Sequence, residues 1–257
     1  MFMEKSLPIP MYLLATVIVI LTLTVVALPT GFYRGLKRAG YDDQFALRRA
    51  AILGAVLLGW IAIVGWLGSI EFFRATPGGV GTLPVAILTP FAVVSIWLRR
   101  DRAAKDAIDH VENWEWIGLQ VLRAAGGMFL ILWSLGMVPG AFALPAGIGD
   151  VTVGVAAAVI ARGLFFRSER YRRAGIFWNI FGITDFVIAV STGFLTSPGK
   201  IQLLSLEKPN QLISVLPLVF IPGFFVPLFL MCHFFSLREL RTTGASTGLP
   251  LTQPSTG

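Results

Sequence analysis

Cysteine, histidine and charged residues are all scarce in this chain. Its 257 residues include one cysteine and two histidines, and 14% are charged, against about 25% in an average soluble domain. The single Cys232 excludes an intrachain disulfide and any metal or iron–sulfur site built from several cysteines of this chain. His110 and His233 lie far apart, which excludes a haem held by two histidines, so we expect no cofactor.

Apolar residues are abundant instead, and they occur in long runs. Hydrophobic residues make up 55% of the chain, and its mean hydropathy is +0.76. A helix needs about 20 apolar residues to cross a bilayer. Seven spans are predicted, at residues 11–33, 50–70, 83–98, 117–138, 143–165, 174–195 and 211–235. The third is the weakest, because it is short and contains Pro84 and Pro90.

These runs predict the fold class and the division of the chain. No loop between them is long enough to fold separately, so we expect one all-α transmembrane domain over residues 1–241. Residues 242–257 are rich in Thr, Ser, Gly and Pro, which predicts a disordered tail. The last span holds no lysine, so the retinal Schiff base of seven-helix microbial rhodopsins is excluded.

The basic residues predict the orientation. Sixteen of the 21 lysines and arginines lie in the loops after spans one, three and five and in the tail, and four lie on the opposite side. Cytoplasmic loops carry the excess of basic residues. We therefore expect the N-terminus outside and the C-terminus in the cytoplasm. The same placement explains the net charge of +7, and no motif indicates nucleic-acid binding.

Residues 99–116 predict a short amphipathic helix at the cytoplasmic surface. Trp114 and Trp116 at its end are expected to act as interfacial anchors. His110 lies there among Asp and Glu residues, which we interpret as a solvated charged face and not as a metal site.

Three charged residues lie deep within spans, where charge is costly and marks functional sites: Arg123, Asp150 and Asp185. Each shares a helix face with small residues, which mark close approaches of membrane helices. The three faces are Gln120, Arg123, Gly127 and Ser134; Gly147, Asp150, Gly154, Ala157 and Ala161; and Asn179, Gly182, Asp185 and Ala189. We therefore expect spans four, five and six to pack together through these faces.

This packing would bring the three charges into one interior. From the helical rise, Arg123 is expected to reach Asp185 readily, and Asp150 only if the helices tilt. One arginine facing two carboxylates leaves one negative charge over, so we expect one ionised and one protonated aspartate. Gln120 and Asn179, nearer the cytoplasmic ends of their helices, are expected to support the site.

The last span contains Pro217, Pro222 and Pro227, and each proline frees a carbonyl one turn earlier. Such interruption is typical of the broken helices that line transporter sites, although simple kinking for packing is the commoner explanation. His233 near the cytoplasmic end is interpreted as a satisfied interfacial polar group and not as a ligand.

Two resemblances follow from these residues. Gly147-Ile148-Gly149-Asp150 resembles the GxGD motif of intramembrane aspartyl proteases, which implies catalytic Asp150 with Asp185 as the second carboxylate. Those families place the partner aspartate in an earlier span, which this chain lacks, and no Pro-Ala-Leu motif follows. The stretch Leu144–Asp150, with Trp178-Asn179 and the proline-rich last span, is similar to uncharacterised bacterial multipass proteins and implies no activity.

Three hypotheses remain. The first is a bacterial inner-membrane protein that binds a small solute, or moves a proton or an ion, at Arg123, Asp150 and Asp185. The second is an accessory subunit whose charges hold helices together and whose partner is another membrane protein. The third is the aspartyl protease. The short loops and the lack of disulfides favour a bacterial inner membrane.

Overall fold

The computed structural model describes residues 10–74, 81–166 and 168–246, and every regular element among them is helical. The first half comprises α1 (Met11–Arg38), α2 (Asp43–Ser69), α3 (Leu83–Arg100), α4 (Arg102–Asp109) and α5 (Asn113–Leu119). The second half comprises the 3₁₀ segment η1 (Gln120–Gly127), α6 (Met128–Ser134), α7 (Gly140–Phe165), α8 (Glu169–Thr196), η2 (Leu212–Ser214), the π-helical η3 (Ile221–Phe225) and α9 (Val226–Ser246).

Within the described ranges, seven helical stretches are long and apolar enough to cross a membrane. They are α1, α2, α3, the continuous run Asn113–Ser134, α7, the stretch Arg170–Thr196 and the stretch Ile221–Thr242. The seven predicted spans correspond to them one for one. Both α1 and α2 extend further than predicted toward the end of the bundle where the basic residues of their loop lie, here called the basic end. Helix α2 starts early because Asp42 accepts backbone hydrogen bonds from Gln44 and Phe45.

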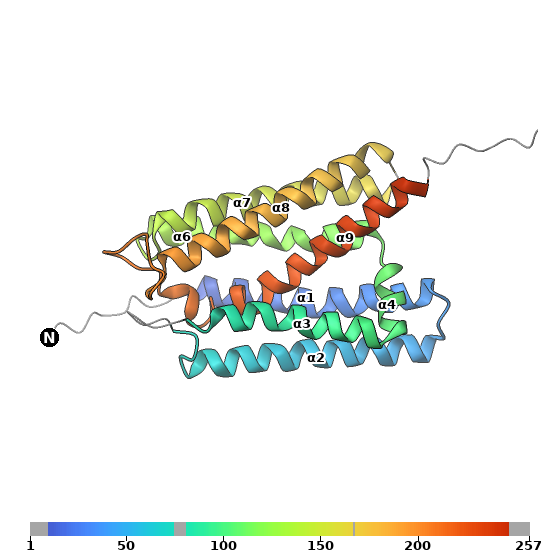
Figure 1. Ribbon diagram of the computed structural model, residues 1–257, viewed down its shortest axis with the longest axis horizontal. Helices are drawn as coiled ribbons and strands as arrows, with labels where there is room; N and C mark the ends of the chain where they lie inside the picture. Colours follow the sequence, from blue (N-terminus) through green and yellow to red (C-terminus); the bar gives the residue numbers. More distant parts are fainter. Residues whose placement is uncertain (1–9, 75–80, 167, 247–257) are drawn as a thin grey trace, which may run out of the picture.

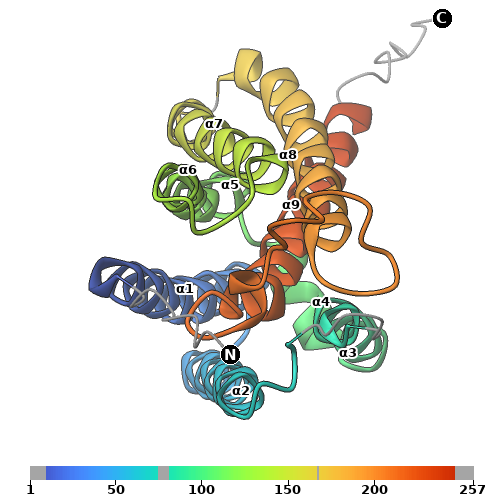
Figure 2. The same ribbon diagram turned by 90° about the vertical axis from the view of Figure 1, so that its left-hand side faces the viewer.

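The helices form two groups with α9 between them. Figure 2 shows α1, α2 and α3 on one side, α5 to α8 on the other, and α9 running between the groups. In the side view of Figure 1, α9 crosses obliquely from the end where the chain begins to the end where α4 lies. In the stretch Ile221–Thr242, which comprises η3 and most of α9, 61% of the most apolar part is buried, against 11% in α2, so this stretch is the central one of the bundle.

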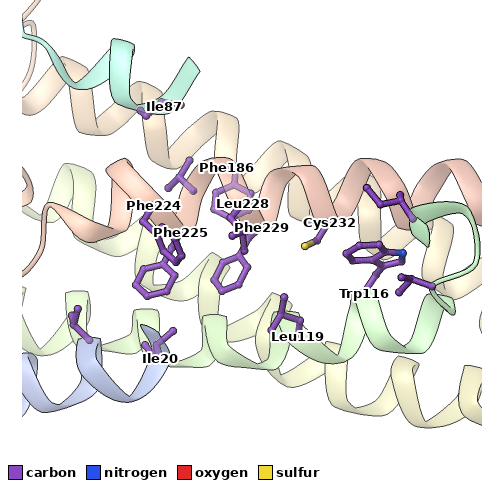
Figure 3. Close-up of a cluster of buried hydrophobic side chains, with 14 residues drawn as sticks. Ile20, Ile87, Trp116, Leu119, Phe186, Phe224, Phe225, Leu228, Phe229 and Cys232 are labelled. Carbon is purple, nitrogen blue, oxygen red and sulfur yellow. The ribbon is translucent and has the colours of Figure 1, made fainter. Parts of the chain in front are cut away.

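The largest apolar cluster lines η3 and α9. Phe224 and Phe225 of η3 pack there with Phe229 and Cys232 of α9 and with residues of α1, α3, α5 and α8. Figure 3 shows Ile20 of α1 and Leu119 of α5 facing this row of η3 and α9 side chains. The cluster therefore joins the two groups of helices through the element that lies between them.

The fourth span is not a uniform α-helix. Residues 120–127 wind as a 3₁₀ helix between α5 and α6, with three residues per turn in place of 3.6. The tighter winding turns the second half of the span relative to the first. As a result, the prediction that Ser134 shares a face with Gln120 and Arg123 is wrong: Ser134 is exposed, while the other two are buried.

The last span begins about ten residues later than predicted. Residues 211–220 contain the short η2 and turns, and the membrane-length helix starts at Ile221. Pro217 therefore precedes the helix, Pro222 lies in the first turn, where proline is tolerated, and Pro227 lies just after the π-helical η3. The helix is continuous beyond Pro227, so the prolines do not break it midway.

The missing amide of Pro227 has a local replacement. In a regular helix, residue 227 would donate to the carbonyl of Gly223, but proline has no N–H. The indole Nε1–H of Trp60, on α2, donates to the Gly223 carbonyl at 2.9 Å. The freed carbonyl is thus satisfied inside the bundle, as a buried backbone group requires.

At the basic end of the bundle, the structure differs from two further predictions. The segment 99–116 is not one helix: α4 ends at Asp109, and α5 starts at Asn113 behind a Glu112–Glu115 capping box. Trp116 is buried and packs against Phe235, so the prediction that it is an interfacial anchor is wrong. His110 is exposed, as expected of a solvated face. Helix α9 continues to Ser246, and residues 247–257 of the predicted tail lie outside the described residues.

Candidate functional site

Arg123 is the centre of a buried polar site. It lies on η1, and 3% of its surface is exposed. Its Nε donates to Oδ1 of Asp150 on α7 at 2.7 Å, and its Nη2 donates to Oδ2 of Asp185 on α8. Its Nη1 lies 3.0 Å from Nε2 of His233 on α9. The guanidinium carbon lies 3.8 Å from the ring centre of Phe186, so one cation connects four helical elements and an aromatic face.

The two carboxylates share one edge of the guanidinium. Nε and Nη2 form the edge that commonly holds a single carboxylate in a bidentate pair. Here each nitrogen serves a different aspartate. Arg123 thus reaches Asp150 as well as Asp185, because the close packing of η1 on α7 brings Asp150 to the guanidinium.

His233 extends the site toward the basic end of the bundle. Its side chain is fully buried, and Nδ1 lies 2.9 Å from Oδ1 of Asn179. Since Arg123 can only donate, Nε2 of His233 must accept, and Nδ1–H donates to Asn179, which is the neutral tautomer. The interpretation of His233 as an interfacial polar group is wrong: it contacts the central arginine directly.

The hydrogen bonds continue in one direction from His233. The amide of Asn179 donates to Ser236 Oγ at 2.9 Å, and Ser236 donates to Asn113 Oδ1 at 2.7 Å. The predicted supporting residue Asn179 is thus part of the network, through His233. Gln120, the other predicted supporting residue, instead donates to the carbonyl of Phe229 at 2.8 Å and ties η1 to α9.

Three glycines make room for the three side chains around Arg123. A Cβ at Gly126 would overlap the carboxylate of Asp150, one at Gly149 would overlap that of Asp185, and one at Gly182 would overlap the imidazole of His233. Small residues therefore occur where a polar side chain of the neighbouring helix needs their space.

Packing also accounts for the local GxGD string. Gly147 lies against Leu130 and the carbonyl of Gly126, and Gly149 lies against Asp185. Both glycines are needed for the close contact of α7 with its neighbours. Their presence before Asp150 has a structural explanation that does not involve a protease.

Two cavities meet at Asp150. One, of about 60 Å³, is bounded by residues of α3, α6, α7, α8 and α9, and Asp150 is its only charged lining residue. The other, of about 40 Å³, is bounded by Arg123, Asp150 and apolar residues. The side chain of Asp150 keeps 17% of its surface accessible, against 8% for Asp185. Asp150 is therefore the carboxylate that faces open space, and Asp185 is the enclosed one.

The formal charges within the site do not cancel. Arg123 contributes one positive charge, the two ionised carboxylates contribute two negative charges, and His233 is neutral in the tautomer described above. The site is short of one positive charge, which a proton or a bound cation would supply. Among the residues that the structure describes, no three His, Cys, Asp or Glu side chains gather to hold a metal ion.

The spacing of residues in the last span indicates that His233 belongs to the site. Phe229, His233 and Ser236 are separated by four and three residues, so they share one face of the last span. That face contacts Gln120, Arg123 and Asn179 through its carbonyl, imidazole and hydroxyl. The polar residues His233 and Ser236 on one face therefore indicate that the last span packs against the site as its fourth helix.

Comparison with known proteins adds a family but no activity. A family model described as "Domain of unknown function (DUF8737)" matches residues 80–241, well over half of the chain, and the chain belongs to this family. The match covers α3 to α9 and so includes every side chain of the site. No curated protein and no solved structure gives a significant match.

Proposed function

We propose that the protein is a seven-span protein of a bacterial inner membrane, with its N-terminus outside and its C-terminus in the cytoplasm. Support for insertion comes from the seven apolar helices. Support for the orientation comes from the sixteen basic residues gathered in the loops after spans one, three and five and in the tail.

Within that membrane, the protein binds and moves a proton, an ion or a small solute at Asp150. The observation that carries this proposal is the contrast between the two aspartates: both are held by Arg123, but Asp150 also lines two cavities. A carboxylate that faces open space can exchange a proton or a cation. In this arrangement Arg123 and Asp185 orient Asp150, and His233 orients Arg123.

The same observations give less support to the two alternatives. An aspartyl protease needs two carboxylates that share one proton around a water molecule. Here each carboxylate is instead paired with the guanidinium of Arg123, Asp150 through Nε and Asp185 through Nη2, so the two are not arranged around a shared proton. A purely structural role for the charges would not require cavities beside one of them.

Flux across reconstituted vesicles tests the proposal. The full chain is incorporated into liposomes, and the decay of an imposed pH gradient and the uptake of labelled Na⁺ and K⁺ are measured separately. We expect at least one flux above protein-free vesicles, and we expect Asp150→Asn to abolish it. Glu207→Gln, which removes an exposed carboxylate from the loop after α8, is the matched control and retains the flux.

Asp185→Asn distinguishes the two carboxylates. It leaves Arg123 paired with Asp150 alone, so the site becomes neutral and the attraction for a cation falls. We expect a reduced rate with retained folding. If flux is the same in the parent protein, Asp150→Asn and Asp185→Asn, the site does not carry transport and the proposal is wrong.

A further inference from the structure

The cavity beside Asp150 has aromatic walls and one charged lining residue. Phe129, Phe142, Phe186 and Phe194 all line it. The remaining lining residues are aliphatic or small, apart from Ser197 and Pro222. A carboxylate within phenyl walls is the environment that binds alkylated ammonium ions, through charge pairing and through attraction of the cation to ring faces.

The carboxylate has an oxygen available. Oδ1 of Asp150 accepts from Arg123, and among the described residues no donor reaches Oδ2. Arg123 itself does not line this cavity, because the ring of Phe186 lies directly against the guanidinium and also faces the cavity. Phe186 therefore separates the fixed cation from the space where a second cation would bind.

The lining disfavours a metal cation. Hard cations replace their water shell with about six or more oxygen ligands. The described lining supplies the side-chain oxygens of Asp150 and Ser197, and the Ser197 hydroxyl already donates to the carbonyls of Gly193 and Asn210. An ammonium ion that carries methyl groups needs fewer such ligands, because each methyl group replaces an N–H donor with an apolar surface that suits apolar walls.

The size of the cavity limits the ligand further. An engineered cavity of about 150 Å³ holds benzene. The cavity here, of about 60 Å³, is less than half that size. The space suits an ammonium ion with one or two carbon atoms, which brings the single positive charge that the site lacks.

We propose that the ligand class of this site is a small alkylammonium ion, with its nitrogen on Asp150 and its methyl groups against Phe129, Phe142 and Phe194. This inference rests on the proposed function, since both use Asp150, and it specifies what Asp150 binds.

Equilibrium dialysis with labelled methylammonium on the full chain in detergent tests the class. We expect saturable binding to the parent protein, at least a tenfold loss of affinity in Asp150→Asn, and unchanged binding in Glu207→Gln. Dimethylammonium should compete, and the same concentration of Na⁺ should not. Phe142→Leu should weaken methylammonium binding by about tenfold, as expected for the loss of one desolvated ring face.

Phe181→Leu is the matched control for the aromatic substitution, because Phe181 lies on α8 with 40% of its surface exposed. It should bind as the parent does, and thermal melting confirms that each variant folds. Equal affinity in the parent and in Asp150→Asn, or equal competition by Na⁺, would overturn the ligand class. If ion or proton flux still depends on Asp150 while methylammonium does not bind, the ligand class fails and the proposed function stands. If flux is also independent of Asp150, both fail.

Discussion

Gly182 and His233 fit together so closely that a Cβ at position 182 would overlap the imidazole ring. The ring in turn accepts from Arg123 and donates to Asn179. The absence of a side chain on α8 thus allows α9 to contribute its histidine to the site.

Gly182→Ala is expected to destabilise the protein. The added methyl group has to displace the imidazole, and overpacking of this kind costs about 1–3 kcal/mol. Thermal unfolding in detergent measures the effect. Gly193→Ala on the same helix is the control, because its Cβ would lie 3.6 Å from Phe142, an ordinary contact. Equal melting temperatures for the two variants would contradict the close fit.

His233 and Asn179 are expected to be energetically coupled. His233→Ala leaves an Arg123 N–H and the Asn179 carbonyl oxygen without their partner, and each such buried group costs about 1–3 kcal/mol. Asn179→Ala removes the same hydrogen bond from the other side. A double-mutant cycle should therefore give a coupling energy of about 0.5–3 kcal/mol. Additive effects would show that the polar network does not act as a unit.

Trp60→Phe is expected to cost about 1–3 kcal/mol, because the Gly223 carbonyl loses its donor. Trp66→Phe on the same helix is the control, since Trp66 is 63% exposed. The loss of unfolding free energy caused by Trp60→Phe should be smaller in a Pro227→Ala background, where residue 227 regains an N–H that can donate to the Gly223 carbonyl. An unchanged cost in that background would show that the indole acts through packing and not through its hydrogen bond.

Tyr41, between α1 and α2, is expected to ionise at unusually high pH. Its hydroxyl donates to Asp106 on α4 at 2.9 Å, and this hydrogen bond raises the pKa of Tyr41, with burial adding to the effect. A raised pKa means that the interaction stabilises the fold below the ordinary tyrosine value of about 10 and is lost as pH rises through the higher folded value. Ultraviolet titration of the parent, Asp106→Asn and Tyr41→Phe measures it. Asp106→Asn should move the Tyr41 component toward lower pH, and no movement would contradict the assignment.

Hydropathy alone predicted the seven membrane-length helical stretches of the described residues and nearly all of their positions, because the apolar runs are long and the loops between them are short. The meeting of Arg123, Asp150 and Asp185 was also predictable, since small residues on a shared face indicate close approach of helices. Both inferences depend on properties of single helices that do not need the tertiary arrangement.

The remaining features depend on how helices contact one another. The 3₁₀ segment η1 packs closely against α7, where a Cβ at Gly154 would overlap the backbone of Ala124. Nothing in the run Gln120–Gly127 alone distinguishes 3₁₀ from α winding. The hydrogen bond to the Gly223 carbonyl at the start of the last span likewise comes from Trp60, which is 163 residues away in the sequence.

The reciprocal fit of Gly126 with Asp150 and of Gly149 with Asp185 has a consequence for the history of the family. At each pair, a gain of volume on one helix is tolerated only with a loss of volume on the other, because the two residues occupy one space. In related sequences these positions should therefore change together, two by two. A relative with alanine at the position of Gly149 should carry a residue shorter than aspartate at the position of Asp185, and would then have lost one of its two anionic groups.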